Sequence, residues 1–320
     1  MVGLERLPRF GAVVTAMVTP FTADGSLDVD GAVTLARWLV ENGSDGLVVA
    51  GTTGEGPVLS DDERRELWTA VSAAVTVPVI AGAGTNDTRH SIELVKAARE
   101  SGVDAVLVVT PYYSRPSQEG LFGHFSAVAA ASDLPVVLYD VPVRSGRRLA
   151  PATIERLVAE VPNVVAVKDA SGDPAGAARL VSRTPDSFEL YSGDDALTLP
   201  LLAVGAVGVV SVASHWIGTE MGEMIAAFAK GDVVGARHAN ARLTESYAFE
   251  STDSFPNPLP AKAMCRVLGQ PAGQCRPPMG DAPPELEGEA RRVLARLGAS
   301  FPESGAGAGA HSGTVVEPGG

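Results

Sequence analysis

Eight short apolar runs, rich in Val, Ile and Leu, recur between residues 12 and 212 with helical stretches between them. Near-continuous apolarity is typical of parallel strands that are covered on both faces. Eight alternating units over this length predict an α/β fold, a (β/α)8 TIM barrel, rather than an open doubly wound sheet. The runs are Ala12–Val18, Gly46–Ala50, Pro78–Ala81, Ala105–Val109, Pro135–Tyr139, Val164–Val167, Phe188–Tyr191 and Ala206–Val212.

Helix-start signals stand between these runs. Ser60-Asp-Asp-Glu63 is a capping box that predicts a helix ending near Ala74, Ser117 suits the cap of the helix that follows it, and Pro151 suits a first helical turn. Beyond about residue 231 the strand pattern stops, and three helices are expected, at Val233–Phe249, Pro260–Leu268 and Pro284–Leu297. We therefore predict an N-terminal arm (1–10), the barrel with the active site (11–230), a small C-terminal helical domain (231–302) and a disordered Gly/Ala-rich tail (303–320).

Composition and charge exclude several classes of partner. The chain has 320 residues and a net charge of −13, whereas nucleic acids and anionic membranes reward clustered Lys and Arg. The long uncharged window Ala196–Thr219 is interrupted by Pro200, Gly205 and Gly208, so it reads as a short helix, a glycine turn and a strand rather than a membrane span. Charges at the N-terminus argue against a secretory signal, and a cytoplasmic protein is expected.

The cysteines and histidines give no sign of a metal site. Cys265 and Cys275 are the only cysteines, and their spacing matches no zinc pattern. The five histidines show no spacing typical of metal ligands. We expect reduced thiols and no bound metal.

Lys168 closes the apolar run Asn163-Val-Val-Ala-Val-Lys168. Active sites of TIM barrels lie at the carboxyl ends of the strands, where this lysine is predicted to be. Burial disfavours the ammonium form, and a neutral amine is the nucleophile needed to form a Schiff base with a ketone. The alternative is a strand-end lysine whose amine reaches water.

Further candidates follow other strands at the same rim. The loop Gly51-Thr-Thr-Gly-Glu55 offers amides and the hydroxyls of Thr52 and Thr53 to a small carboxylate, although ordinary glycine turns have the same composition. The phenol of Tyr139 is expected beside Lys168, and Thr52 would pass a proton on to Tyr113 in a relay; alternatively Tyr139 is a core aromatic. No catalytic role is assigned to Glu55.

Three charged residues near the rim are further candidates for binding or chemistry. Arg144 lies on the loop after the fifth run, where its guanidinium would bind a second carboxylate, or be a solvated surface group. Asp194 and Asp195 precede a helix start, which favours capping over a catalytic pair.

With these residues the chain resembles the pyruvate-dependent class I aldolase superfamily, and within it the dihydrodipicolinate synthase family. The similarity runs from about Gly11 to Leu297 and is most specific at Gly51–Glu55, Thr110–Pro116, Tyr139–Gly146 and Val167–Gly172. It implies a Schiff base between Lys168 and pyruvate, with Tyr139 as the central proton donor and acceptor. Thr52 and Tyr113 would complete the relay, with Tyr113 supplied by a neighbouring subunit. The remaining implied contacts are those of Thr53 and Val210 with pyruvate, Gly193 along the pocket, and Arg144 with the carboxylate of L-aspartate 4-semialdehyde.

The activity implied by the resemblance is the condensation of pyruvate with L-aspartate 4-semialdehyde, in diaminopimelate and lysine biosynthesis. The protonated imine would act as the electron sink, so no metal or organic cofactor is implied, and a homo-oligomer (dimer or tetramer) is expected. Two alternatives stay open, a lyase for a 2-keto-3-deoxy sugar acid or N-acetylneuraminate, and a non-catalytic barrel that senses pyruvate or an amino acid. Feedback inhibition by lysine is not expected, because only Asn86 and Tyr112 match the inhibited type among Gly56, Pro57, Asp61, Arg64, Asn86, His90 and Tyr112.

Overall fold

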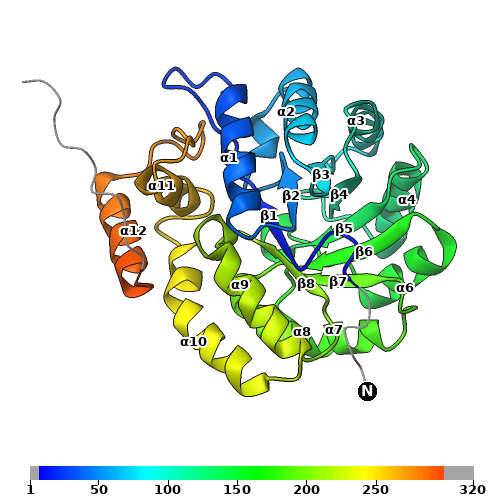
Figure 1. Ribbon diagram of the computed structural model, residues 1–320. Coiled ribbons are helices and arrows are strands. Elements are labelled where there is room, and N and C mark those ends of the chain that lie inside the picture. Colours follow the sequence, from blue (N-terminus) through cyan, green and yellow to red (C-terminus); the bar gives the residue numbers. More distant parts are fainter. Residues whose placement is uncertain (1–6, 299–320) are drawn as a thin grey trace, which may run out of the picture.

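The computed structural model describes residues 7–298, in which eight parallel strands form a closed barrel (Figure 1). Each strand pairs with the next along the chain, and the last pairs with the first. The predicted (β/α)8 barrel is therefore confirmed, with each strand inside its predicted run or within two residues of it. The strands are β1 Val13–Ala16, β2 Gly46–Val49, β3 Val79–Gly82, β4 Ala105–Val109, β5 Val136–Asp140, β6 Val164–Asp169, β7 Glu189–Ser192 and β8 Gly208–Ser211.

Alternation along each strand divides the apolar side chains between two cores. On β5, Val137 and Tyr139 belong to a cluster inside the barrel, whereas Val136 and Leu138 pack in the layer between strands and helices. Both sets are buried, which explains why the strands read as continuous apolar runs. Successive residues at the end of a strand therefore point to opposite sides of the sheet.

Helices surround the barrel, as Figure 1 shows. Ser60 and Glu63 form the predicted capping box: Ser60 Oγ accepts a hydrogen bond from the Glu63 amide (3.2 Å), and the Ser60 amide donates to Glu63 Oε2 (2.8 Å). The outer helices are α1 Val29–Glu41, α2 Asp61–Ala74, α3 Thr88–Glu100, α4 Gln118–Ala129, α6 Pro151–Glu160, α7 Pro174–Val181, α8 Thr198–Leu202 and α9 Ser214–Ala229. Three single turns stand at the rim: η1 Gly56–Val58, α5 Pro142–Ser145 and η2 Asp195–Leu197.

Three further helices follow the barrel, within one residue of their predicted bounds: α10 Val233–Phe249, α11 Leu259–Val267 and α12 Pro284–Arg296. Helix α10 packs along α9 and shares an apolar cluster with β1 and β8, which includes Val13, Val209 and Leu243. Helices α11 and α12 pack together around a separate cluster. The division into a barrel and a helical domain stays a prediction, and the predicted tail 303–320, like most of the arm 1–10, lies outside the described residues.

The N-terminal end of the barrel is closed by aromatic and acidic side chains. Phe10 packs beside Tyr191, whose hydroxyl donates to Glu189 Oε2 (3.0 Å). The other oxygen of Glu189 accepts a hydrogen bond from the Arg9 amide (2.9 Å). This end is filled, so a ligand has room only at the opposite, carboxyl end of the strands.

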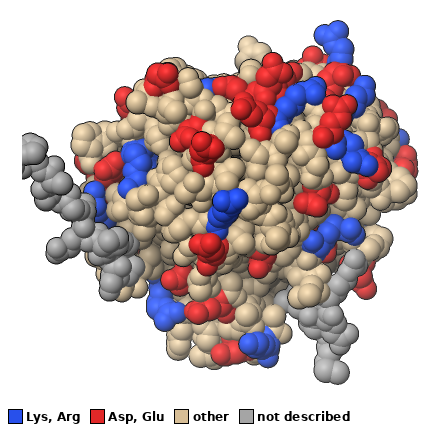
Figure 2. Space-filling view, turned by 45° about the horizontal axis from the view of Figure 1, so that its top comes forward, with Lys and Arg blue, Asp and Glu red and all other residues tan. Residues whose placement is uncertain are grey.

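No helix in the described part of the chain has the length and apolarity needed to cross a membrane. On the face shown in Figure 2, acidic side chains are interspersed with Lys and Arg across an otherwise uncharged surface. The acidic excess on that face is therefore spread out rather than gathered in one region.

Candidate active site

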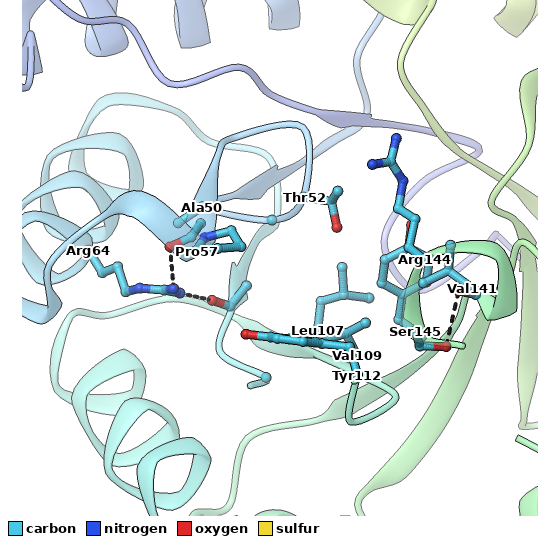
Figure 3. Close-up of a pocket in the computed structure, with 15 residues that line it drawn as sticks. Ala50, Thr52, Pro57, Arg64, Leu107, Val109, Tyr112, Val141, Arg144 and Ser145 are labelled. Carbon is cyan, nitrogen blue, oxygen red and sulfur yellow. Dashed lines mark hydrogen bonds between the residues drawn. The ribbon is translucent and has the colours of Figure 1, made fainter. Parts of the chain in front are cut away.

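A cavity of about 230 Å³ opens at the carboxyl ends of β2 to β5. Figure 3 shows Thr52, Arg144 and Tyr112 around the same opening, each from a different βα connection. This is the end of a (β/α)8 barrel that carries active sites. The lining comprises Ala50, Gly51, Thr52, Gly56, Pro57, Arg64, Gly82, Gly84, Leu107, Val109, Tyr112, Tyr139, Val141, Arg144 and Ser145.

Lys168 and Tyr139 occupy paired positions on neighbouring strands. The two residues are register partners of β5 and β6, and both are nearly buried, at 5% and 6% exposure. The Lys168 Nζ lies 4.4 Å from the centroid of the Tyr139 ring. Tyr139 lines the cavity, whereas Lys168 is not among the residues that line it. The amine of Lys168 therefore lies against the ring of a tyrosine that lines the cavity.

Gly193 leaves the space that the Lys168 side chain needs. A methyl group built on Gly193 would lie 3.0 Å from Lys168 Cγ and 2.9 Å from Ala170 Cβ. Both distances are shorter than ordinary carbon contacts, so any larger residue would push the lysine stem aside. Val210 is buried on β8 and packs in the same barrel-interior cluster as Tyr139.

The loop Gly51–Glu55 follows β2 and carries the two predicted threonines. Thr52 is half-buried and lines the cavity. Thr53 is buried, and its hydroxyl accepts a hydrogen bond from Asn257 Nδ2 (3.0 Å). Glu55 points away from the cavity into a buried ion pair with Lys262, with 2.6 Å between Oε1 and Nζ. The sequence offered no sign of these two C-terminal partners, because they lie more than 200 residues along the chain.

Arg144 lies on a single helical turn rather than on the predicted loop. Pro142 at the first position favours helical φ, and Gly146 ends the turn in the left-handed region at φ 69°. The turn directs Arg144 to the mouth of the cavity, where its side chain is exposed. A guanidinium in this position has the geometry to receive a carboxylate entering from solvent.

Tyr113 is not brought to Thr52 within one chain. Its side chain is 91% exposed, and its backbone is held at φ 72°, in the left-handed region. The preceding residue, Tyr112, lines the cavity instead. The predicted relay through Thr52 and Tyr113 is therefore incomplete in a single subunit.

The carboxylates near the rim hold the backbone together. Asp194 accepts hydrogen bonds from the Ala196 and Leu197 amides and so caps the turn that follows it, as predicted. Asp195 does not cap that turn; it accepts hydrogen bonds from the Val212 and Ala213 amides, which follow β8. Asp140 follows Tyr139 but points to the outer side of β5 and accepts from the Leu149 amide (2.9 Å). Burial raises the pKa of Asp140 to about 6.

The family model for the "Dihydrodipicolinate synthetase family" matches residues 9–297. The chain belongs to that family. The curated protein named 4-hydroxy-tetrahydrodipicolinate synthase from Acidothermus cellulolyticus is 51% identical over 292 residues, which are 90% of this chain and 93% of that protein. The protein of the same name from Moorella thermoacetica is 48% identical, over 93% of this chain and 99% of that protein.

Solved structures of family members have the same fold. Dihydrodipicolinate synthase from Bacillus anthracis superposes with a TM-score of 0.87 at 43% identity. The match covers 93% of this chain and 100% of the Bacillus anthracis chain. The synthase from Cyanidioschyzon merolae was solved with lysine bound, and it superposes with a TM-score of 0.86 at 43% identity. The match covers 90% of this chain and 98% of the Cyanidioschyzon merolae chain.

Membership of the dihydrodipicolinate synthetase family decides between the functions left open by the sequence. The chain is an enzyme, a lyase of the class I aldolase type, and the predicted 4-hydroxy-tetrahydrodipicolinate synthase function is confirmed over a sugar-acid lyase or a sensor. Within residues 7–298, no group of three or more His, Cys, Asp or Glu side chains is placed to hold a metal ion. Both cysteines are free and buried.

Proposed function

We propose that Lys168 forms a Schiff base with pyruvate and that the resulting enamine condenses with L-aspartate 4-semialdehyde. The pairing of Lys168 with Tyr139 carries this proposal, because it sets a buried amine against a phenol at the inner edge of the cavity. The substrates are those of the dihydrodipicolinate synthetase family. Arg144 and Thr52 supply further polar groups around the opening.

The first half of the reaction activates pyruvate. The neutral Nζ of Lys168 attacks the keto carbon, the keto oxygen takes up a proton, and loss of water from the carbinolamine leaves a protonated imine. A proton then leaves the methyl carbon, and the imine nitrogen takes the electron pair as an enamine forms. Tyr139 donates and accepts these protons, because its phenol is the titratable group beside the amine.

The second half makes the carbon–carbon bond. The enamine carbon attacks the aldehyde carbon, and the aldehyde oxygen takes up a proton. The amine of the second substrate then attacks the imine carbon, which closes the ring and releases Lys168. Arg144 binds the carboxylate of the semialdehyde at the mouth of the cavity, and its exposed position suits a group that arrives after pyruvate.

The pyruvate carboxylate is assigned to the Gly51–Glu55 loop, through the amides there and the hydroxyl of Thr53. Gly193 lies against the stem of Lys168, and Val210 packs in the barrel-interior cluster that contains Tyr139. Tyr113 is exposed in one chain, so a second copy of the chain is proposed to deliver it to Thr52 and complete the relay. Full activity then requires at least a dimer.

Trapping with borohydride tests the proposal. Pyruvate and borohydride together should add one pyruvate-derived group to Lys168, which peptide mass spectrometry would locate. Lys168→Ala should give no adduct, whereas Lys96→Ala, an exposed lysine on α3, should give the full adduct. A pyruvate adduct on other lysines, or undiminished synthase activity in Lys168→Ala, would refute the assignment.

A further inference from the structure

The Gly51–Glu55 loop is held from behind by the C-terminal helical segment. Lys262 on α11 forms an ion pair with Glu55, and the two side chains are 1% and 3% exposed. The Lys262 amine also donates to the Gln274 carbonyl (2.8 Å) and lies 4.2 Å from the centroid of the Phe21 ring. A barrel loop and a helix about 200 residues apart are thus joined by a buried charge pair.

Two more contacts from the same segment reach the loop. The amide of Arg276 donates to the second carboxylate oxygen of Glu55, Oε2, at 2.9 Å. Asn257 Nδ2 donates to the hydroxyl of Thr53 at 3.0 Å. The carboxylate of Glu55 therefore has a C-terminal partner at each oxygen, and the threonine two residues earlier has a third.

The backbone of the loop needs such support. Ala50 and Glu55, at its two ends, both have left-handed backbones, with φ of 58° and 55°. L residues with side chains avoid this region, and a strained conformation persists only where surrounding contacts determine it. Within the loop, the Glu55 amide donates to the Thr52 carbonyl (3.0 Å). The orientation of Glu55 is therefore coupled directly to that of Thr52.

We propose that Glu55 and Lys262 are positioning residues for pyruvate: their ion pair fixes the Gly51–Glu55 loop in the shape that receives the carboxylate. This inference rests on the proposed role of the loop in pyruvate binding. Neither side chain lines the cavity, so they act through Thr52 and Thr53. A buried ion pair contributes little net stability in comparison with an apolar pair of similar volume, which favours a role in specifying a conformation.

Three variants separate positioning from stability: Lys262→Met, Glu55→Gln and the double variant. Each single variant leaves one buried charge without its partner, so its melting temperature should fall. The double variant removes both charges, and its melting temperature should return toward that of the unsubstituted chain. Its loop lacks the ion pair, however, so the pyruvate concentration that gives half-maximal borohydride adduct should stay raised about tenfold or more, with Lys168 still labelled at saturation.

Arg266→Met is the matched control, because Arg266 stands one turn further along α11 and pairs with Glu287 on α12 instead of the loop. Its half-maximal pyruvate concentration should equal that of the unsubstituted chain. A double variant with recovered stability and unchanged half-saturation would overturn the positioning role alone. If the single variants do not fold, the double variant still decides. Failure of the unsubstituted chain to form any adduct would overturn the proposed function together with this inference.

Discussion

Replacing Gly193 with alanine tests whether the space beside Lys168 is needed for Schiff-base formation. The added methyl group would lie 3.0 Å from Lys168 Cγ and 2.9 Å from Ala170 Cβ. Carbon atoms prefer separations of about 3.5–4.0 Å, so the neighbours must move by roughly 0.5 Å or more. The lysine stem is the more mobile neighbour, and a shift at Cγ is carried to the amine. Misplacement of reacting groups by about 1 Å can cost roughly 100-fold in rate.

We therefore expect Gly193→Ala to slow adduct formation on Lys168 by about 10- to 100-fold. Overpacking should also lower the free energy of unfolding by about 1–3 kcal/mol. The assay is the rate of borohydride trapping at saturating pyruvate, with thermal unfolding measured on the same samples. Gly123→Ala on α4 is the control, because apart from its chain neighbours and the backbone of its own helix no atom lies within 4 Å of the added methyl group. Trapping of folded Gly193→Ala at the unsubstituted rate would refute the reasoning.

Three further predictions concern the other rim residues and the response to acid. Arg144→Ala should lower kcat/KM for the semialdehyde by about 10- to 100-fold, through loss of a charged hydrogen bond, and leave pyruvate trapping unchanged; equal effects on both would contradict its role. Tyr113→Phe should lower turnover, and the activity of the unsubstituted chain should fall on dilution if a second subunit supplies this phenol. Burial lowers the pKa of His124 to about 4, so unfolded chains bind more protons than folded chains between pH 6.5 and 4. The free energy of unfolding should therefore decrease by up to about 3 kcal/mol as the pH is lowered through this range. Denaturant titrations should show a smaller decrease in His124→Gln.

The barrel could be predicted because each of its strands can be recognised from a short stretch of consecutive residues. A parallel strand covered on both sides needs an unbroken apolar run, and each of the eight runs became a strand. The capping box at Ser60–Glu63 also needs only four consecutive residues. Lys168 and Tyr139 were expected together for a similar reason, because each lies one residue before the end of its strand and the two strands are neighbours in the barrel.

Turns too short to leave a sequence pattern, and contacts between residues far apart in the sequence, were not predicted. The single turn that carries Arg144 is too short for a hydrophobic period, and its signals, Pro142 and Gly146, are equally common in loops. Asn257 contacts Thr53 across 204 positions, and the pattern around either residue carries no information about the other.

The cost of burying an ammonium group applies to Lys262 as well as to Lys168. Helix α11 is buried on all sides from Leu259 to Cys265, so a lysine within it is as costly as a lysine in an apolar strand. The same rule therefore marks both residues as used, and their surroundings separate the uses. The Lys262 amine is occupied by the Glu55 carboxylate and the Gln274 carbonyl, which leaves it a structural cation. Lys168 faces the ring of Tyr139, and within residues 7–298 no carboxylate lies within ion-pair distance of its amine, which is what the proposed attack on a keto acid requires.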